Sequence, residues 1–555
     1  MNRIGQYEKI FYLVFFLLMI TGAAFGQRLK YKTSSVDGVF RGKKIAGEDV
    51  IELVNGVEYT QKDTRIFCDS SLFYKKKNLF EAYNNIRILD GDSVTITADT
   101  LFYDGKEKKA SLTGNVVYTA GTKRLYTDKL DYNLLTKVSY FNTGGRLIDE
   151  QNDLTSKIGY YYSRIDQAIF YDSVRLKAES FDLSTDTLKY FTISKVAFTE
   201  GPTIIVTNTG NTINNIGGRY ETVREKMDLV DGKVETKDYF LEGDELLLDD
   251  FTQYYKAIGN VKLTAKNNDV IITGEEGYYN RVSGLSKVYG KPVMKKIMEV
   301  DTFYLSSDTL VAIESELDSA KRILGYSDVR IFRENLQAIT DSVSYFLADS
   351  TIYMYQDPVL WTGENQITGD TISLLIQNQV VDKMYLFRNS FMSSKDTLGN
   401  FNQVSGRNMV AQFDQTVIEK VDVLGNGESL YFALSANEEY MLGMNKSTCS
   451  NLLLSFTNNE LSSIDFYVQP ESAMIPPHEL NSSLTKLKGF TWRLNERPTL
   501  PYVLLRPEKV KPGGSPEDDQ TPDSDARKGD SIPERFKEGM KKAPIAPAEE
   551  EEEGQ

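Results

Sequence analysis

Histidine and cysteine are scarce in this sequence of 555 residues, and each shortage excludes a kind of chemistry. His478 is the only histidine, so histidine-based catalytic triads, histidine-rich zinc sites and imidazole acid–base catalysis are almost excluded. The two cysteines, Cys68 and Cys449, lie too far apart in sequence to suggest a CxxC site. We expect two small apolar side chains rather than a disulfide.

Basic residues are outnumbered by acidic ones, and prolines are few in the body of the chain. Lys and Arg number 64 against 79 Asp and Glu, which gives a formal charge of -15 and a pI near 4.9. Since the broad positive surface that nucleic acids require is missing, we expect no nucleic-acid partner. Only three of the 15 prolines, Pro202, Pro292 and Pro358, lie between residues 27 and 468. This stretch therefore contains few residues that break a strand or a helix.

One apolar run stands near the N-terminus, and no later segment approaches a membrane span. Residues 10–20 (IFYLVFFLLMI) follow Arg3 and Lys9 and precede small residues, which is the layout of a signal peptide cleaved before Gln27. The run is shorter than the about 20 apolar residues that a spanning helix needs. We expect an exported protein, with no cysteine near the cleavage site to carry a lipid anchor.

Strand-forming segments are abundant in the body of the chain. Short stretches rich in Val, Ile, Thr, Tyr and Phe alternate apolar and polar residues, as in Val94–Ala98 and Val270–Thr273. Residues 256–263 (KAIGNVKL) place an apolar set on one face and a polar set on the other. Helical periodicity is scarce, and we expect only short helices near residues 312–321 and in the C-terminal quarter.

The segments repeat. Asp99-Thr-Leu-Phe-Tyr103 returns at Asp128–Tyr132, Asp186–Tyr190 and Asp341–Tyr345, and Asp99 and Asp128 are 29 residues apart. A period near 30 with two strands per unit is typical of stacked repeats, in which neighbouring units bury one another's apolar faces. The sequence therefore predicts an all-β fold, an elongated stack of antiparallel strands, with about 30 strands between residues 27 and 469.

Changes in composition predict the domain boundaries. Alternation lapses at 207–218 (TNTGNTINNIGG), and the residues beyond 507 are rich in proline and end in an acidic run. The expected parts are a signal peptide (1–26), a first β-domain (27–206), a connecting region (207–238), a second β-repeat region (239–470), a C-terminal cap segment (471–507) and a disordered acidic tail (508–555).

Two consecutive motifs suggest a family. Thr97–Tyr103 (TADTLFY) is followed by Leu112–Val116 (LTGNV), and Gly259-Asn-Val261 repeats the second motif. This pattern resembles the OstA/LptA-like family of organic-solvent-tolerance and lipopolysaccharide-transport proteins, in its long Bacteroidota form. The resemblance is strongest over about residues 30–199.

The resemblance implies an open β-jellyroll, or β-taco, whose two sheets shield lipid A acyl chains in an apolar groove. It implies a non-enzymatic periplasmic protein associated with the outer membrane, with lipopolysaccharide, other β-jellyroll transport modules and an outer-membrane translocon as partners. No catalytic residue, metal or cofactor is expected. The expected groove residues are Ile96, Ala98, Leu101, Leu112, Val116, Val261 and Leu263.

Other interpretations of the same residues stay open. The seven apolar residues could form the plain core of a closed sandwich, because inward positions look the same in both cases. The recurrent Asp99, Asp128, Asp341 and Asp370 suggest calcium or acid–base chemistry, but their placement before strands favours turn capping. Tyr103, Tyr132, Tyr190 and Tyr345 could stack on sugar rings, although a half-exposed strand ladder is the commoner explanation.

Two other functions compete with lipid transport. An exported structural or adhesive repeat protein could use the same stack as a spacer. A polysaccharide-processing enzyme would need carboxylates clustered with a basic partner, and the aspartates are instead spread along the chain.

Overall fold

The computed structural model describes residues 29–505, except Ser34, Asp238, Gln379 and the pairs 267–268, 299–300, 415–416 and 458–459. The expected signal peptide and acidic tail lie outside the described residues. Within them the protein is nearly all β, with short helical elements, which confirms the predicted fold class. The chain forms two compact units, Met1–Leu229 and Val230–Gln555.

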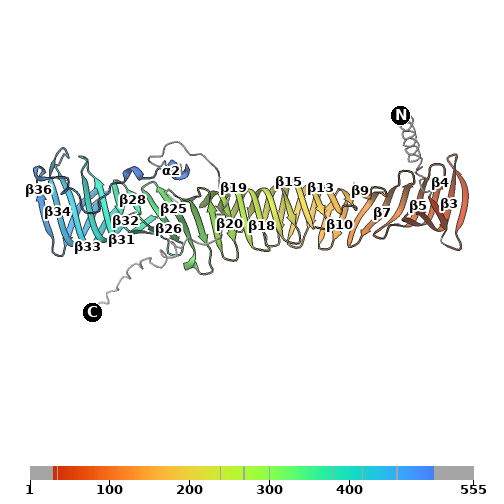
Figure 1. Ribbon diagram of the computed structural model, residues 1–555, viewed down its shortest axis with the longest axis horizontal. Helices are drawn as coiled ribbons and strands as arrows, with labels where there is room; N and C mark the ends of the chain where they lie inside the picture. Colours follow the sequence, from red (N-terminus) through yellow and green to blue (C-terminus); the bar gives the residue numbers. More distant parts are fainter. Residues whose placement is uncertain are drawn as a thin grey trace, which may run out of the picture. The chain divides into compact units, whose positions relative to one another are not determined.

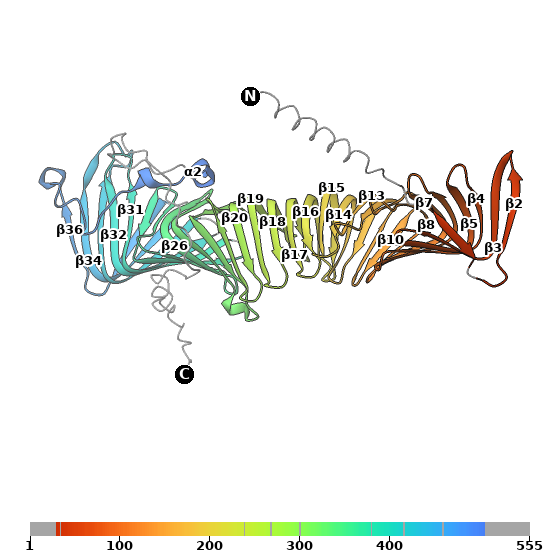
Figure 2. The same cartoon turned by 45° about the vertical axis from the view of Figure 1, so that its right-hand side comes forward.

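The strands of the first unit follow one another in chain order (Figures 1 and 2). They are β1 (Lys30–Thr33), β2 (Val39–Ile45), β3 (Glu48–Gln61), β4 (Thr64–Tyr74), β5 (Leu79–Asp90), β6 (Val94–Asp104), β7 (Lys109–Ala120), β8 (Lys123–Asn133), β9 (Val138–Phe141), β10 (Gly145–Asp149), β11 (Asn152–Ser156), β12 (Ile158–Tyr162), β13 (Gln167–Lys177), β14 (Phe181–Phe191), β15 (Val196–Thr207), β16 (Thr212–Glu221) and β17 (Lys226–Glu235), the last of which spans the unit boundary.

The second unit holds the remaining elements. They are β18 (Tyr239–Asp249), β19 (Tyr254–Ala265), β20 (Val270–Asn280), β21 (Leu285–Tyr289), β22 (Val293–Ile297), β23 (Thr302–Ser306), β24 (Thr309–Ile313), η1 (Asp318–Ala320), β25 (Arg322–Arg333), β26 (Leu336–Phe346), β27 (Thr351–Tyr355), β28 (Val359–Thr362), β29 (Asn365–Thr368), β30 (Thr371–Gln377), β31 (Val380–Lys395), β32 (Phe401–Asp414), β33 (Val417–Leu434), β34 (Met441–Thr457), β35 (Glu460–Tyr467), β36 (Glu471–Ile475), η2 (Pro477–Glu479), η3 (Leu494–Glu496) and α2 (Leu500–Leu505).

Each long strand pairs antiparallel with its neighbours and is interrupted near its middle. Between β5 and β6 the pairing shifts at Tyr83/Ile86, where Asn84 and Asn85 both adopt positive φ and oppose one residue of β6. Such a bulge bends a strand. The same interruption recurs at β6/β7 and at β19/β20. We call these points corners.

The corners divide the strands into two sheets that face each other. Sheet I contains strand halves such as Val94–Ala98, and sheet II contains halves such as Thr100–Asp104. The Phe80 ring of sheet II stacks on the Tyr59 ring of sheet I with centroids 4.0 Å apart, and both side chains are fully buried. The apolar face of each sheet therefore covers that of the other, as the alternation predicts.

The recurrent aspartates stabilise the corners. Asn115 donates a hydrogen bond to Asp99 Oδ2 on the preceding strand over 2.8 Å, and Asn260 and Asp244 make the same contact. Gly114 has φ +80, and a Cβ there would lie 2.5 Å from Asp99 Oδ2, so this corner requires glycine.

Asp99 was expected to cap its own turn. Its carboxylate instead accepts a hydrogen bond from Asn115 on the next strand. Asp370 accepts a hydrogen bond of 3.0 Å from Asn389 in the same way. The side chain of an aspartate at a corner points toward the adjacent strand, because it opposes the two bulged residues there. The spacing of residues in the sequence does not predict that an asparagine of the adjacent strand contacts the aspartate.

The region expected to connect two domains, 207–238, forms strands. It contains the whole of β16 and β17, and the boundary between the two units falls inside it, after Leu229. Alternation lapses here because a polar residue, Asn215, occupies a buried position and donates hydrogen bonds to Gly217 O and Tyr220 Oη. Internal hydrogen bonds let a strand carry a buried amide.

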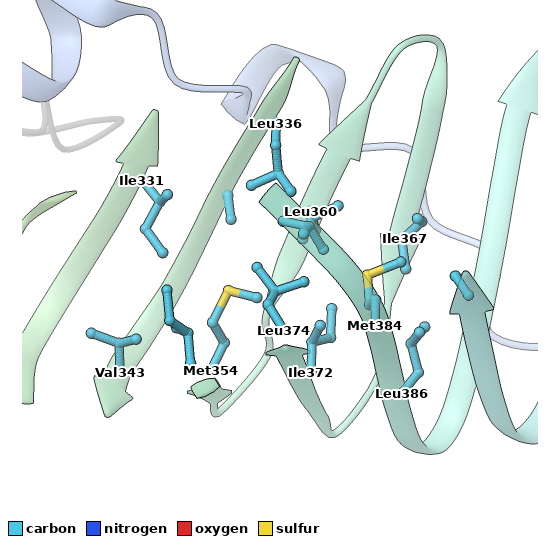
Figure 3. Close-up of a cluster of buried hydrophobic side chains, with 14 of the residues drawn as sticks. Ile331, Leu336, Val343, Met354, Leu360, Ile367, Ile372, Leu374, Met384 and Leu386 are labelled. Carbon is cyan, nitrogen blue, oxygen red and sulfur yellow. The ribbon is translucent and has the colours of Figure 1, made fainter. Parts of the chain in front are cut away.

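The second unit repeats this architecture around its own core. Apolar residues of both sheets form one cluster, shown in Figure 3, where Ile331, Leu360 and Ile367 of sheet I lie opposite Val343 and Met354 of sheet II. All five are at most 1 % exposed. Close packing of this kind is typical of a protein interior.

The segment after β36 covers the outer face of sheet I, where Leu487 lies in one apolar cluster with Phe432 of β33 and Met444 of β34. The Gln403 amide pairs with Thr485 O and the Leu487 amide, and the Gln366 amide pairs in the same way with residues 491 and 493. The adjacent Ile367 points into the core, so Gln366 points outward. The segment therefore runs back along the unit.

Candidate functional site

The predicted groove residues lie in the interior between the two sheets. In the first unit Ile96, Ala98, Leu101, Leu112 and Val116 are between 0 and 7 % exposed. Leu101 and Leu112 are paired across β6 and β7. Their burial shows that the sheets meet here and that side chains fill the space between them.

The interior is less tightly enclosed at β19–β22 of the second unit. Val261 is buried, but Leu263, its inward neighbour on β19, is only half-buried. Leu263 pairs with Ile272 of β20, and Val270 and Val288 are likewise half-buried against the same core cluster. These three side chains form a half-buried part of the interior.

Polar groups bridge the rims of the two sheets on the side opposite the corners. Tyr132 of sheet II donates a hydrogen bond of 2.5 Å to Asp90 Oδ2 of sheet I, and Lys137 forms an ion pair with the same oxygen. Thr64 donates to the other oxygen over 2.8 Å. This rim bridge satisfies a carboxylate that is almost fully buried.

The rim bridge repeats along the first unit. Tyr190 donates to Asp149 Oδ2 over 3.0 Å, and Lys195 Nζ lies 2.7 Å from Asp149 Oδ1. A third bridge has its charges exchanged, because Lys123 belongs to sheet I and Asp166 follows sheet II. The bridges hold the rims together, so access to the interior of this unit requires them to separate.

The tyrosines were expected to form a half-exposed ladder, and this prediction is wrong. Tyr103, Tyr132, Tyr190 and Tyr345 are at most 7 % exposed. Burial raises the pKa of Tyr103, Tyr132 and Tyr190 far above the usual range, and hydrogen bonds to aspartate raise those of Tyr132 and Tyr190 further. These phenols are therefore interior hydrogen-bond donors, and they do not present a surface for sugar rings.

The Asp90 carboxyl links rim closure to pH. Burial acts to raise its pKa, but hydrogen bonds from Lys137, Tyr132 and Thr64 outweigh burial and hold the pKa below its usual value. A carboxylate with a lowered folded-state pKa stabilises the protein above its unfolded pKa of about 3.9, and this contribution is lost as the pH falls through the folded value.

We therefore expect the stability of the first unit to fall below about pH 4. The Asp90→Asn variant should have a lower free energy of unfolding than the unmodified protein at neutral pH. Below about pH 4 it should lose less of that free energy, as measured by urea unfolding at neutral and at acidic pH. Asp92→Asn, at an exposed position in the adjacent hairpin, serves as the control. Equal acid sensitivity in Asp90→Asn and the unmodified protein would contradict the assignment.

The described residues contain no group of three or more metal-ligating side chains, and no helix among them is long and apolar enough to cross a membrane. Cys68 and Cys449 are free thiols, as expected, and burial raises the pKa of Cys68 to about 12. A thiol that remains protonated is a poor nucleophile.

Comparison with protein families supports the resemblance, because residues 36–186 match the family described as OstA-like protein. A search of curated proteins gives no significant match. Among solved structures, the chain is similar to LptH, the LptA-homologous periplasmic component of the lipopolysaccharide transport device of Pseudomonas aeruginosa. The match has 16% identity and a TM-score of 0.14, and it covers 25% of this chain and 81% of LptH.

Proposed function

This protein carries an OstA-like region at residues 36–186, and from this premise we propose that it is a non-enzymatic periplasmic component of lipopolysaccharide transport. The observation that supports the proposal most strongly is the apolar interior that each unit encloses between two sheets. Each methylene buried from water contributes on the order of 0.8 kcal/mol, so acyl chains alone can supply the affinity.

The half-buried part of the interior in the second unit is the proposed point of first contact. Leu263, Val270 and Val288 are the apolar side chains that a lipid would cover there. In the first unit the chains would have to replace the packing of residues such as Leu101 and Leu112, after the rim bridges separate. Assembly of the outer membrane through further transport modules belongs to the same proposal.

Site-specific photo-crosslinking in a Gram-negative envelope tests this function. A photo-reactive residue at Leu263 should capture lipopolysaccharide, because its side chain lies against the apolar core. The matched control is Lys262, the adjacent residue of β19, which is exposed. Equal capture at the two positions, or none at Leu263, would contradict the proposal. Intact lipid asymmetry after depletion of the protein would favour a spacer instead.

A further inference from the structure

Cations gather on the outer face of sheet I in the first unit. Inward residues of this sheet, such as Ile66, Ile88 and Leu125, are buried, so the residues next to them on each strand point outward. The strands of this sheet pair in the order β4, β5, β6, β7, β8, β10, β11 and β13, which at about 4.8 Å per strand makes the face about 34 Å wide. Its exposed cations, which we call the cationic face, are Arg65, Arg87, Arg124, Arg146, Arg175 and Lys177.

Two of these arginines lie beside one aromatic ring. Phe67 follows Arg65 by two residues on β4 and is paired with Arg87 of β5. The guanidinium carbons of Arg65 and Arg87 lie 5.9 and 4.9 Å from the centroid of the Phe67 ring. The face of an aromatic ring attracts a cation, so Phe67 stabilises two like charges close together on the outer face.

The carboxylates around this pair of arginines are bound elsewhere or lie at the ends of β4. Glu58 of β3, opposite the aromatic ring, has its Oε2 3.0 Å from Lys32 Nζ. Asp69 accepts a hydrogen bond from Asn85 at the corner, and Asp63 lies in the turn before β4. Among the described residues, no carboxylate is within ion-pair distance of either guanidinium group.

The same construction recurs four strands further along the sheet. Tyr126 follows Arg124 by two residues on β8 and is paired with Arg146 of β10. Here Asp153 of β11 accepts a hydrogen bond of 2.9 Å from Arg146 Nε. Arg124 has no such partner among the residues that the structure describes, so this group keeps one uncompensated cation.

Positive charge is in excess on this face alone. Away from the turns and corners, the six cations share it with two carboxylates, Asp153 and Asp182, the second of which lies opposite Lys177. On the outer face of sheet II, lysines and carboxylates are equal in number along the same strands. They are Lys109, Lys129 and Lys189 against Glu81, Asp104 and Asp131.

We infer that the cationic face binds the surface of an anionic lipid membrane. Cations spread over about 34 Å cannot all contact one small anion, whereas the phosphates of a bilayer cover such an area. Surfaces that bind membranes combine Lys and Arg with aromatic and aliphatic side chains. Phe67 and Tyr126 lie between the cations, and Ile204 and Val206 of β15, which are 50 and 46 % exposed, extend the same face.

This inference goes beyond the proposed function, because it concerns the outer face of sheet I and not the interior between the sheets. The two can therefore fail separately. A failed crosslink at Leu263 would leave binding to the membrane surface unaffected, and loss of membrane binding would leave the apolar interior unaffected.

Co-sedimentation of the full mature protein with vesicles that contain no lipopolysaccharide tests the inference. We expect vesicles of phosphatidylglycerol and phosphatidylethanolamine to bind at least about tenfold more tightly than vesicles of phosphatidylcholine. Arg124→Gln should weaken binding to the anionic vesicles about fivefold, because each cation near such a surface contributes to the attraction. High salt should weaken it as well, because salt screens exposed charges.

The matched control is Lys129→Gln, which removes the same charge from the same strand, β8, but from the outer face of sheet II. Both side chains are exposed, so both variants should unfold at the temperature of the unmodified protein. Lys129→Gln should keep its affinity for the anionic vesicles. Equal weakening in the two variants would show that only net charge matters and would overturn the inference.

Arg124→Lys separates a lipid surface from a ligand that requires the guanidinium group. Attraction to a bilayer depends on the charge, so this variant should retain most of the binding. Loss of binding in Arg124→Lys, or no preference for the anionic vesicles in the unmodified protein, would overturn the inference. Binding of soluble polyglutamate without binding of the anionic vesicles would also overturn it and would indicate an acidic protein as the partner.

Discussion

Replacing Lys195 by methionine should destabilise the strands around it by about 3–5 kcal/mol. The Asp149 side chain is fully buried, and Lys195 is its cationic partner at 2.7 Å. Removing the ammonium group leaves a buried carboxylate that, among the described residues, accepts a side-chain hydrogen bond from Tyr190 alone. Breaking one side of a buried pair costs far more than the pair itself contributes, because the remaining charge is uncompensated.

Hydrogen exchange of the β10 and β14 amides measures this loss locally, which suits a stack in which stability is distributed over neighbouring strands. Lys177→Met, at an exposed position of β13, is the control and should change little. The double variant Lys195→Met, Asp149→Leu should recover much of the loss, because neither charge then remains. A loss below about 1 kcal/mol in Lys195→Met would show that the pair is solvated.

Replacing Phe80 by alanine should cost about 3–5 kcal/mol, the range for a fully buried aromatic residue. Its ring stacks on Tyr59 with centroids 4.0 Å apart and lies 5.0 Å from the centroid of the Tyr103 ring. The substitution leaves a cavity that joins the two sheets. Because Tyr59 and Tyr103 then lose a neighbour, protection of β3 and β6 should fall together with that of β5.

Tyr83→Ala on the same strand is the matched control, because that side chain is 37 % exposed and points outward. We expect a loss near 0.5 kcal/mol or less, as for other surface substitutions. The measurement is again hydrogen exchange, read for β3, β5 and β6. Similar losses for the two variants would show that the interior around Phe80 can relax to fill the cavity.

The interior of the fold could be predicted because a strand has a period of two. Ile96 and Ala98 lie two residues apart on β6, and both are buried, as alternation predicts. The half-buried state of Leu263 could not be predicted, since it depends on how closely the facing sheet packs. Apolar alternation gives the face of a residue but contains no information on the distance to the opposite face.

The hydrogen-bond partners of the polar residues could not be predicted from the sequence, for a different reason. Tyr132 and Asp90 are 42 residues apart and meet only because the ladder bends at its corners. The stretch from 476 to 505 gave no periodic signal, because its hydrogen bonds go to outward glutamines such as Gln366 and Gln403 and not to a regular ladder. Contacts between side chains on opposite sides of a corner can be predicted only when the position of the corner is known.

The corners also determine how this architecture can change in length. Asn85 and Asp69, Asn115 and Asp99, and Asn260 and Asp244 are each 16 residues apart, so each of these three corners is completed by its neighbour on the preceding strand. A duplication that starts and ends at equivalent corners adds two strands, about 10 Å of stack. Within each unit, the length of the stack can therefore change in steps of one repeat.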